Sequence, residues 1–594
     1  MSDNDEIATR LEEFADLLEA NGVEYKPRAY RRAAENVRDY PESVLALAAD
    51  GEAAIQNIDR VGDAIASKIV EYAETGSIAE LDELRAELPV DMAALTSVEG
   101  VGPKTVGALY EELGVETLDD LEAAAAAGEI QEIKGFGPKT EQNILDGIDF
   151  AREAHDRSLL GEAIPRGEAV RDFLRDADAV SACELAGSIR RWKETVGDVD
   201  VLAASDDPEA VVGTFADWDG ADSVIEAGTG KASVRAGGVR VDLRVVAPSE
   251  FGSALQYFTG SWDHNVRLRN RAIERDLKMN EYGVFDISEQ RSDDSSVDTD
   301  GASVAEDPEA DQRAGERVAG DTEESMYEVL DLPWIPPELR EDRGEITAAA
   351  EGDLPDLLTE DDVRGDLHVH TDWSDGTESI AEMVAGAAEF GHDYVAITDH
   401  ATGPGMVGGV GLDDETLREQ IDEVRAVAED ADIAVFAGVE ANIATGGSVS
   451  VADDVLAALD FVVASPHAGL DGDGTERLVT AAKHPDVDAI GHPTGRMLNQ
   501  RAGLTVDIER LATVAADHDT ALEINADPRR LDLDGRAVKT AVEQGVQIVI
   551  DTDAHRTSSY DHVRYGVHTA RRGWAESGDV LNARDTDGIR TFLD

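Results

Sequence analysis

The spacing of hydrophobic positions divides the chain into three stretches. Residues 1 to about 150 are rich in Ala and Leu and are broken by Gly-containing turns, which predicts a bundle of amphipathic helices. Between about 163 and 250, short β-type runs lie between helices and predict a small sheet. From about 363 to 594, apolar runs of strand length alternate with helical segments, which is typical of a βα barrel.

Two polar segments interrupt this pattern. Residues 288–325 are rich in Asp, Glu, Ser and Gly and contain no aromatic residue. Such a segment cannot bury enough apolar surface to fold, so we expect a disordered acidic insertion. After Pro333–Glu338, a second Pro-containing, acidic segment runs to about 362 and is expected to be a linker.

Charge is the unusual feature of the composition. The 594 residues, enough for about four domains, include 52 Lys and Arg against 127 Asp and Glu, a formal net charge of −75. Such a surface repels itself at ordinary ionic strength, whereas a Debye length of about 3 Å in 1 M salt screens the repulsion. Because the acidity is spread over the whole chain, it favours a salt-adapted cytoplasm over a local surface for cations or basic partners. It does not exclude a nucleic-acid partner.

Several features lead us to expect a cytoplasmic protein. The single cysteine, Cys183, excludes an internal disulfide and fits a reducing compartment. The first ten residues, MSDNDEIATR, are acidic and do not form a signal peptide. No apolar stretch approaches the roughly 20 residues that a membrane span needs.

Histidines and carboxylates recur in short motifs of the last stretch, most of them directly after an apolar, β-branched run. These positions predict side chains at the carboxyl ends of barrel strands, where such folds keep their chemistry. Imidazole and carboxylate together suit Zn²⁺, Mn²⁺ or Fe²⁺, and the set is too large for one ion. The predicted ligands are His368, His370, Asp375, His400, Glu440, His467, His492, Asp553 and His555.

Three Gly-containing turns of the first stretch, at residues 58–65, 98–104 and 133–139, resemble one another. A Gly-rich turn before a helix directs backbone N–H groups outward and suits a phosphate. Because such contacts read no bases, we expect binding to the DNA backbone without sequence preference. The DNA-binding residues predicted here are Gly100, Gly102, Lys104, Gly135, Gly137 and Lys139.

The middle stretch contains an Asp-x-Asp pair. Asp198 and Asp200, two apart on a predicted strand, would share one face and form a site for two Mg²⁺ ions about 3.5–4 Å apart. Asp242 lies inside another β-run, where a carboxylate is costly unless a metal or a partner compensates it. The preceding turn can hold a triphosphate. Its predicted nucleotide-binding residues are Gly187, Ser188, Arg191 and Gly197.

On these motifs, residues 1 to about 345 resemble the X family of DNA polymerases, to which DNA polymerase beta belongs. The segment Tyr257-Phe258-Thr259-Gly260-Ser261 is similar to the nucleotide-pocket motif of that family. The resemblance implies that Tyr257 and Phe258 face the incoming sugar and that Gly260 leaves room for it. It also implies dNTP substrates, two Mg²⁺ or Mn²⁺ ions, and gapped or nicked DNA.

The same resemblance assigns further residues. Asn265 and Arg269 match pocket residues near the base pair and the template, and Arg240 and Arg244 match arginines that flank the third metal aspartate. Lys68 aligns with the Schiff-base lysine of the lyase domain, where an amine attacks the aldehyde of an abasic sugar. A plain phosphate contact is the alternative for Lys68. The remaining DNA contacts are predicted at Lys26, Tyr30, Lys231 and Arg240.

Residues 363–594 resemble the PHP (polymerase and histidinol phosphatase) domain, so the whole chain is similar to fusions of polymerase X with PHP, here of haloarchaeal type. This resemblance distributes the ligands over three ions and makes Glu440 a bridge, and arginines at 496, 529 and 530 could hold substrate phosphate. The implied sets are His368, His370, Glu440 and Asp553; Glu440, His467 and His492; and Asp375, His400 and His555.

We therefore expect a multidomain α+β and α/β chain. Its expected parts are a helical lyase-like domain at 1–87, helix-hairpin-helix fingers at 88–155, a nucleotidyltransferase palm at 156–250, a thumb with the acidic insertion 288–325 at 251–345, a linker at 346–362 and a distorted (β/α)₇ PHP barrel at 363–594.

The predicted function is a monomeric DNA polymerase that fills short gaps in base excision repair. It would carry a 3′-5′ exonuclease or 3′-end phosphodiesterase that uses two to three Mn²⁺, Zn²⁺ or Fe²⁺ ions, with abasic-site lyase or AP-endonuclease activity as a further option. The alternatives are a repair nuclease whose polymerase half only binds DNA ends, a non-catalytic DNA-end scaffold, and a small-molecule phosphatase.

Overall fold

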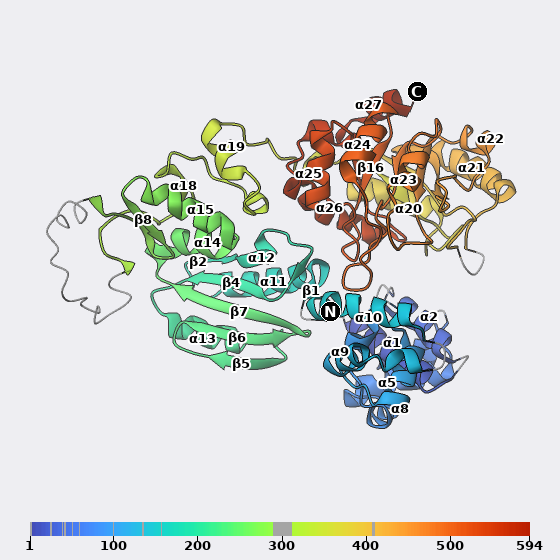
Figure 1. Ribbon diagram of the computed structural model, residues 1–594, viewed down its shortest axis with the longest axis horizontal. Helices are drawn as coiled ribbons and strands as arrows, with labels where there is room; N and C mark the ends of the chain where they lie inside the picture. Colours follow the sequence, from blue (N-terminus) through green and yellow to red (C-terminus); the bar gives the residue numbers. More distant parts are fainter. Residues whose placement is uncertain are drawn as a thin grey trace. The chain divides into compact units, whose positions relative to one another are not determined.

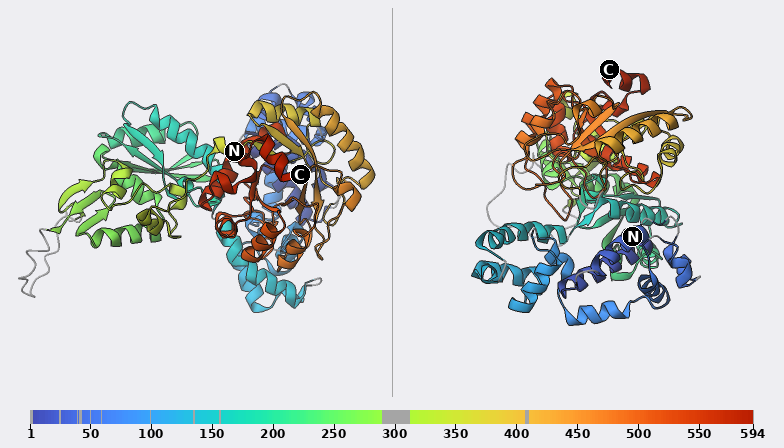
Figure 2. Two further views of the ribbon diagram at one scale, coloured as in Figure 1. Left: turned by 90° about the horizontal axis from the view of Figure 1, so that it is seen from above. Right: turned by 90° about the vertical axis from the view of Figure 1, so that its right-hand side faces the viewer.

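The computed structural model describes residues 3–593 except 24–25, 39, 41–42, 50, 59, 99, 134–135, 156, 289–311 and 407–409. The chain divides into two compact units (Figures 1 and 2). One comprises residues 1–158 with 499–501, and the other comprises residues 159–498 with 502–594.

The N-terminal unit is built from helices, as the spacing predicts. Leu11 and Phe14 of α1 lie in its core. Helices α1 and α8 approach so closely that a Cβ on Gly107 would lie 2.1 Å from the carbonyl oxygen of Ala20, so only glycine fits there. The helices are α1 Asp3–Ala20, α2 Lys26–Arg38, α3 Val44–Ala48, α4 Glu52–Ile55, α5 Asp63–Thr75, α6 Ala79–Glu87, α7 Met92–Thr96, α8 Pro103–Leu113, α9 Leu118–Ala127, η1 Ile130–Glu132 and α10 Pro138–His155.

The segment that follows forms a five-stranded mixed sheet of order β2-β4-β7-β6-β5. Strand β4 is parallel to β7 and antiparallel to β2, and β6 is antiparallel to both of its neighbours. Helices α11 and α13 pack against this sheet. The elements are β1 Ser158–Leu159, α11 Leu160–Arg175, β2 Ala182–Leu185, α12 Gly187–Arg190, β3 Thr195–Val196, β4 Val199–Ala204, α13 Pro208–Ala216, β5 Ser223–Ala227, β6 Lys231–Ala236 and β7 Val239–Val246.

Helices and a small antiparallel sheet, β10-β9-β8, form the thumb segment. Strand β10 and the start of α18 lie within the segment predicted to be disordered, so that prediction is wrong for these residues, because β10 pairs with β9. Residues 289–311 of that segment lie outside the described residues. The elements are η2 Pro248–Glu250, α14 Phe251–Thr259, α15 Trp262–Ile273, β8 Leu277–Asn280, β9 Gly283–Asp286, β10 Glu316–Ala319, α18 Glu323–Glu328, η4 Pro337–Leu339, α19 Glu345–Glu351 and η5 Glu360–Asp362.

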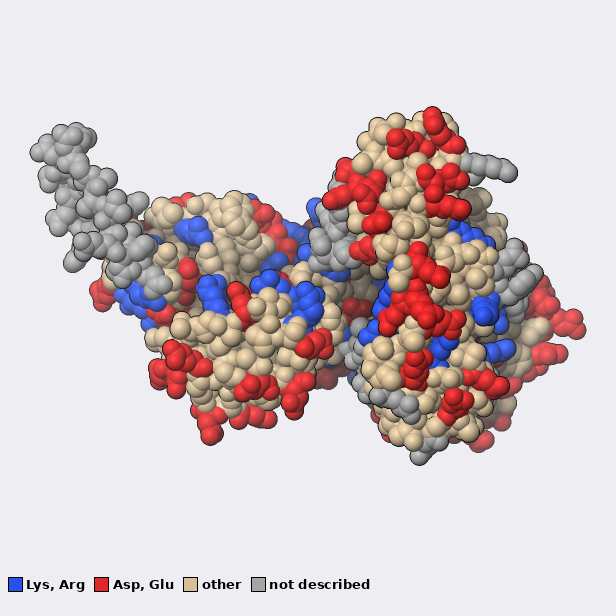
Figure 3. Space-filling model, turned by 90° about the horizontal axis from the view of Figure 1, so that it is seen from below, with Lys and Arg blue, Asp and Glu red and all other residues tan. Residues whose placement is uncertain are grey.

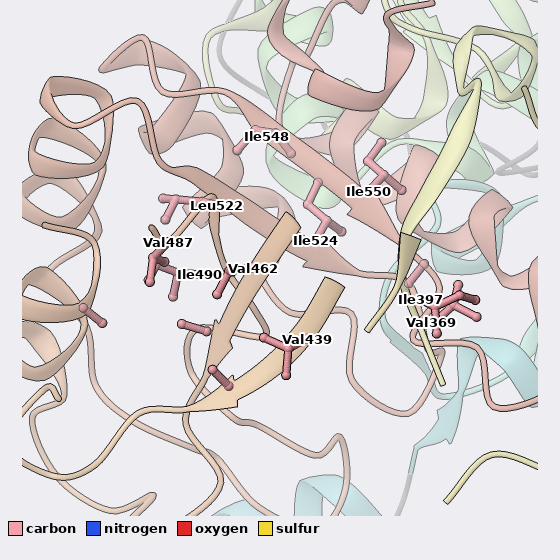
Figure 4. Close-up of a cluster of buried hydrophobic side chains, with 14 of the residues drawn as sticks. Val369, Ile397, Val439, Val462, Val487, Ile490, Leu522, Ile524, Ile548 and Ile550 are labelled. Carbon is pink, nitrogen blue, oxygen red and sulfur yellow. The ribbon is translucent and has the colours of Figure 1, made fainter. Parts of the chain in front are cut away.

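The last segment is a parallel seven-stranded barrel whose strands follow one another in chain order. A bridge between Val369 and Ala554 brings its first and last strands together. Branched side chains of the strands form the buried core, among them Val439, Ile490 and Ile550 (Figure 4). The strands are β11 Gly365–Val369, β12 Tyr394–Ile397, β13 Ala434–Asn442, β14 Phe461–Ser465, β15 Ala489–Ile490, β16 Ala521–Asn525 and β17 Ile548–Asp551.

Helices connect these strands, as expected for parallel neighbours. The connecting helices are α20 Ile380–Phe390, α21 Asp414–Ala428, α22 Asp453–Leu456, α23 Thr475–Ala481, α24 Ile508–Asp517 and α25 Gly535–Glu543. The last strand is followed by η6 Thr557–His562, α26 Val563–Arg572, η7 Ser577–Asp579, η8 Leu581–Ala583 and α27 Thr586–Leu593. The predicted fold class is therefore confirmed. Within the described part of the chain, no helix combines the length and the apolar character that a membrane span requires.

Candidate functional site

The histidine and carboxylate motifs of the barrel converge at the carboxyl ends of its strands. His368 lies in β11, His400 follows β12 and Glu440 lies in β13. Both His368 and Glu440 are fully buried. The ligand atoms form three groups within 4.8 Å: His368, His370 and Asp553; His400, Glu440 and His467; and His370, Asp375, His400 and His555. The predicted ligand His492 joins them, with its Nε2 2.9 Å from Glu440 Oε1.

The grouping differs in part from the one that the PHP resemblance implies. His400 faces Glu440 and His467 as well as Asp375, because its two ring nitrogens point to different carboxylates. His370 likewise belongs to two groups. Glu440 lies between them, with carboxylate oxygens 3.6 Å from His368 Nε2 and 3.8 Å from His370 Nε2. This central place suits a bridging carboxylate.

The donor atoms fit divalent cations. Several buried ring nitrogens have no hydrogen-bond partner among the described residues, including His368 Nε2, His467 Nδ1 and both nitrogens of His370. Buried polar atoms are rarely left unpaired, and metal ions would satisfy them. Burial alone would raise the pKa of Glu440, but the charges of His467, His400 and His368 hold it well below its usual range. The residue is therefore ready to bind a cation as a carboxylate.

Glu523 supports two of the predicted ligands and was missed by the sequence analysis. Its Oε1 lies 2.6 Å from His368 Nδ1, and its Oε2 accepts a hydrogen bond from the backbone N–H of His492. Because Glu523 occupies Nδ1, the Nε2 atom of His368 is left to face the metal group. The available signal was an acidic residue inside the apolar run of β16, the same signal that identified Asp242.

Asp399 has a similar supporting role near Asp375. One carboxylate oxygen of Asp399 accepts hydrogen bonds from the Thr371 backbone at 2.8 Å and from the Ser374 hydroxyl. The other accepts from the Thr371 hydroxyl at 2.7 Å and from the Gln420 amide. The loop that carries Asp375 is therefore anchored to the residue that precedes His400.

One of the three predicted arginines lies next to the ligand groups of the barrel. Arg530 Nε lies 3.8 Å from Asp553 Oδ2, next to a predicted ligand. Arg496 instead donates to the backbone carbonyl of Arg530 at 2.8 Å, and Arg529 pairs with Asp527 at 2.6 Å. Of the three, Arg530 is therefore best placed to meet a substrate phosphate, and Arg496 braces its loop.

The three aspartates of the palm also meet. Asp200 and Asp242 are register partners on the parallel strands β4 and β7, so their side chains share one face. Burial and the neighbouring charges of Asp198 and Asp242 raise the pKa of Asp200 to about 7. This repulsion is what a cation between the three carboxylates would relieve. The arrangement fits the predicted divalent-ion site.

The Gly-Ser turn lies directly against this cluster. Gly187 has φ +61°, and a Cβ there would lie 1.9 Å from Asp200 Oδ2, so no other residue fits. Arg191, predicted to hold the triphosphate, is engaged elsewhere. Its Nε donates to Glu341 at 2.7 Å and its Nη1 to the carbonyl of Thr259 at 2.6 Å. Its side chain therefore joins the palm to the thumb. Ser188 and Gly197 flank the aspartates in the chain.

The predicted nucleotide pocket is held together by Asn265. Its amide donates to the carbonyl of Tyr257 at 2.7 Å, and a Cβ on Gly260 would lie 2.5 Å from its Oδ1. Phe258 packs at right angles to Tyr257 and under the Arg244 guanidinium. Three further residues of this region were predicted to contact DNA or template. Lys231 and Arg269 are exposed, and Arg240 pairs with Asp242 at 2.8 Å.

Two of the three Gly-containing turns of the helical unit share a left-handed residue at the matching position. Gly100 has φ 82°, and Arg60, at the matching position of the first turn, has φ 61°. Gly102 caps α8, with Lys104 exposed just beyond it. In the third turn Gly137 is half-buried and Lys139 is exposed, whereas Gly135 lies outside the described residues. Two described turns therefore hold the same conformation before a helix.

The predicted lyase residues lie in a more enclosed setting. The side chain of Lys68 is 12% exposed, pairs with Glu80 and lies 5.0 Å from the centre of the Phe14 ring. Tyr30 also packs on Phe14 and is only 6% exposed. Its ring belongs to the core, which does not favour the predicted DNA contact. Lys26, at the start of α2, is exposed.

Comparison with known proteins decides the family. Family models match residues 2–78 (helix-hairpin-helix domain), 92–149 (SAM-like helix-hairpin-helix tandem), 254–341 (DNA polymerase beta thumb) and 366–526 (PHP domain). The chain is 35% identical over 596 residues to the DNA polymerase/3′-5′ exonuclease PolX of Bacillus subtilis, covering 99% of both chains. The chain belongs to the family X DNA polymerases that carry a C-terminal PHP domain.

Partial relatives match each half of this family X polymerase. DNA polymerase lambda of Rattus norvegicus is 26% identical over 356 residues, 56% of either chain. A probable phosphatase of Caldicellulosiruptor saccharolyticus is 34% identical over 206 residues, 32% of this chain and 79% of the phosphatase. Both parts of the resemblance seen in the sequence are thus confirmed at the level of family, whereas the haloarchaeal type stays a prediction.

Proposed function

We propose that this protein fills short gaps in DNA during base excision repair and trims 3′ ends with its barrel. The observation that carries the polymerase is the meeting of Asp198, Asp200 and Asp242 beside a turn that only glycine allows. Two Mg²⁺ or Mn²⁺ ions held by these carboxylates would supply activation of the primer hydroxyl and neutralisation of the triphosphate.

The surrounding residues position the nucleotide. The N–H groups of the Gly187-Ser188 turn can receive the triphosphate. Tyr257 and Phe258 form a wall that Asn265 braces from behind through the carbonyl of Tyr257. The exposed cations Lys231 and Arg269 lie free of the core for contact with DNA backbone or template. Each protein group thus binds or orients a part of the substrate.

For the barrel we propose a 3′-5′ exonuclease or 3′-end phosphodiesterase. Its ligand groups can hold two to three ions, and histidine with carboxylate favours Mn²⁺, Zn²⁺ or Fe²⁺ over Mg²⁺, which prefers oxygen ligands. Such ions supply Lewis-acid activation of water and of a phosphoryl oxygen. Arg530 is placed to orient the phosphate, and Glu523 fixes the ring of His368.

A gapped duplex with a labelled primer tests both activities together. In molar KCl with Mn²⁺, the full-length protein should extend the primer when dNTPs are present and shorten it when they are absent. Shortening without extension would favour the alternative, a repair nuclease whose polymerase half only binds DNA ends. The complete aspartate cluster argues against that alternative.

An abasic-site lyase or AP-endonuclease activity is a further proposal. Lys68 is shielded and lies beside an aromatic ring, which suits an amine nucleophile, but its pair with Glu80 must open first. Borohydride should trap the parent protein on abasic DNA, and Lys68→Ala should prevent trapping. Trapping that survives in this variant would assign Lys68 to the plain phosphate contact.

We further propose a monomer that works in a salt-rich cytoplasm. Acidic side chains are spread over much of the face seen in Figure 3, and the net charge is −75. Because the Debye length falls from about 10 Å at 0.1 M to about 3 Å at 1 M salt, DNA binding should strengthen toward molar KCl. Tighter binding at 0.1 M than at 2 M KCl, measured by fluorescence anisotropy, would contradict this proposal.

A further inference from the structure

Helix α26 of the barrel turns one row of polar side chains toward the palm and thumb of the same compact unit. Arg564, His568 and Arg572 are four residues apart and share one helix face. Arg564 pairs with Glu168 of α11 at 2.8 Å. The ring of His568 stacks on Trp192, with 3.6 Å between the ring centres and 4° between the planes. An ion pair and a ring stack therefore join α26 to the palm.

Arg572 contacts the turn that begins at Gly187. It is 2% exposed, and its Nη1 donates to the backbone carbonyl of Arg191 at 2.7 Å. Its guanidinium also lies 3.6 Å from Glu341 and 3.9 Å from Glu194. Glu341 is the carboxylate that accepts from the Arg191 side chain. One barrel residue thus touches both the backbone of Arg191 and the partner of its side chain.

The carbonyl that Arg572 binds belongs to a tightly folded turn. Residues 187–193 begin at Gly187 against Asp200 and close where the Lys193 N–H donates to the carbonyl of Ser188 at 3.2 Å. Trp192 has φ 54°, a left-handed conformation that bulky residues adopt only when their surroundings impose it. The stack on His568 and the hydrogen bond from Arg572 act at this strained end of the turn.

Arg572 also balances the negative charges of Glu194 and Glu341. Burial opposes the ionised form of Glu194, but Arg572, Arg496 and Lys193 outweigh it and hold its pKa at about 2. Removing Arg572 would leave the partly buried Glu194 and Glu341 with less positive charge beside them, and poorly compensated charges away from water are costly. We expect the palm turn to shift in response, because Arg572 holds it through the backbone carbonyl of Arg191.

We propose that Arg572, although it belongs to the barrel, is a positioning residue for nucleotidyl transfer. It holds the turn 187–193 in the geometry that receives the triphosphate. The inference rests on the proposed polymerase function and adds to it a dependence of the palm on the barrel. Arg572 belongs to none of the three ligand groups of the barrel, so its loss should leave phosphodiester hydrolysis in place.

Steady-state primer extension on gapped DNA tests this inference with the full chain in molar KCl. Arg572→Ala should raise the KM for dNTP by about tenfold or more, the effect of losing one hydrogen bond from a charged group. Its kcat should stay within about threefold, and its hydrolysis of single strands should be unchanged. Arg572→Lys, which keeps the charge but has one donor group, should give an intermediate KM. Arg510→Ala, on an exposed barrel arginine paired with Glu476, is the matched control.

The outcomes separate the two proposals. If the parent protein does not extend primers, the proposed polymerase function fails. If the parent extends them and Arg572→Ala keeps the parental KM for dNTP while hydrolysing normally, the positioning role is overturned. If Arg572→Ala loses both activities, Arg572→Lys decides: a parental KM in that variant overturns the inference, and a raised KM with normal hydrolysis supports it.

Discussion

The palm and the barrel both gather carboxylates for divalent ions, but they treat the charge of those carboxylates in opposite ways. In the palm, Asp198 and Asp242 face Asp200 and raise its pKa to about 7. In the barrel, histidines surround Glu440 and hold its pKa well below its usual range. The palm carboxylates therefore repel one another until a cation binds, whereas the negative charge of Glu440 in the barrel is balanced by the neighbouring histidines.

This difference indicates how each site is used. The palm carboxylates are half-buried and suit ions that come and go with the nucleotide. The barrel ligands His368, His370 and Glu440 are fully buried, and Glu523 holds the ring of His368, which suits ions that stay in place.

The palm aspartates should be indispensable for synthesis alone. Asp198→Ala or Asp200→Ala should lower primer extension by at least about a thousandfold, because each carboxylate is proposed to hold an ion on the triphosphate. Degradation of a labelled single strand should stay at the parental rate. Asp206→Ala, an exposed aspartate close in the chain, is the control. Primer extension within tenfold of the parental rate would contradict the assignment of Asp198 and Asp200 as metal ligands.

The barrel histidines should show the reverse pattern. Replacing His368 and His370 together with Ala should lower single-strand degradation by about a hundredfold or more, because a metal group loses two ligands and activated water is lost with it. Primer extension should persist. His518→Ala, an exposed histidine, is the control. Degradation at the parental rate in the double variant would make the barrel structural.

Glu523 tests whether bracing matters in the barrel. Glu523→Gln keeps the shape but weakens the hold on His368 Nδ1, so Mn²⁺ affinity should fall by about 10- to 100-fold. Calorimetric titration of Mn²⁺ measures this directly. Glu423→Gln on the exposed side of α21 is the control. An unchanged affinity would show that the metal groups need no such support.

Repulsion between the palm carboxylates should make the stability of the metal-free protein depend on pH. The pKa of Asp200 is about 7 in the folded state, raised from 3.8. Between pH 3.8 and pH 7, the folded state therefore keeps a proton on Asp200 that the unfolded state has released. Stability from this group is thus lost as the pH rises toward 7. At pH 8, Asp200→Asn should raise the melting temperature by about 3 °C, and at pH 4 the difference should be small. Equal melting curves at pH 8 would argue against the repulsion.

Much of both sites could be predicted from the sequence, because the signals are local. Spacing of two residues places Asp198 and Asp200 on one strand face, and a histidine after a β-branched run lies at a strand end wherever the strand goes. The fold class followed from hydrophobic periodicity for the same reason. These statements depend on neighbours in the chain and on strand geometry alone.

Other features depend on partners that are distant in the sequence, and only the tertiary structure decided them. Arg191, predicted to hold the triphosphate, pairs with Glu341, and Tyr30, predicted to contact DNA, packs in the core. Strand β10 forms in a polar segment because β9 offers it a ladder of hydrogen bonds. Arg572 meets the carbonyl of Arg191 across 381 positions of the chain. Composition and spacing specify the chemistry of a side chain, but which partner satisfies it is decided by the packing of the whole fold.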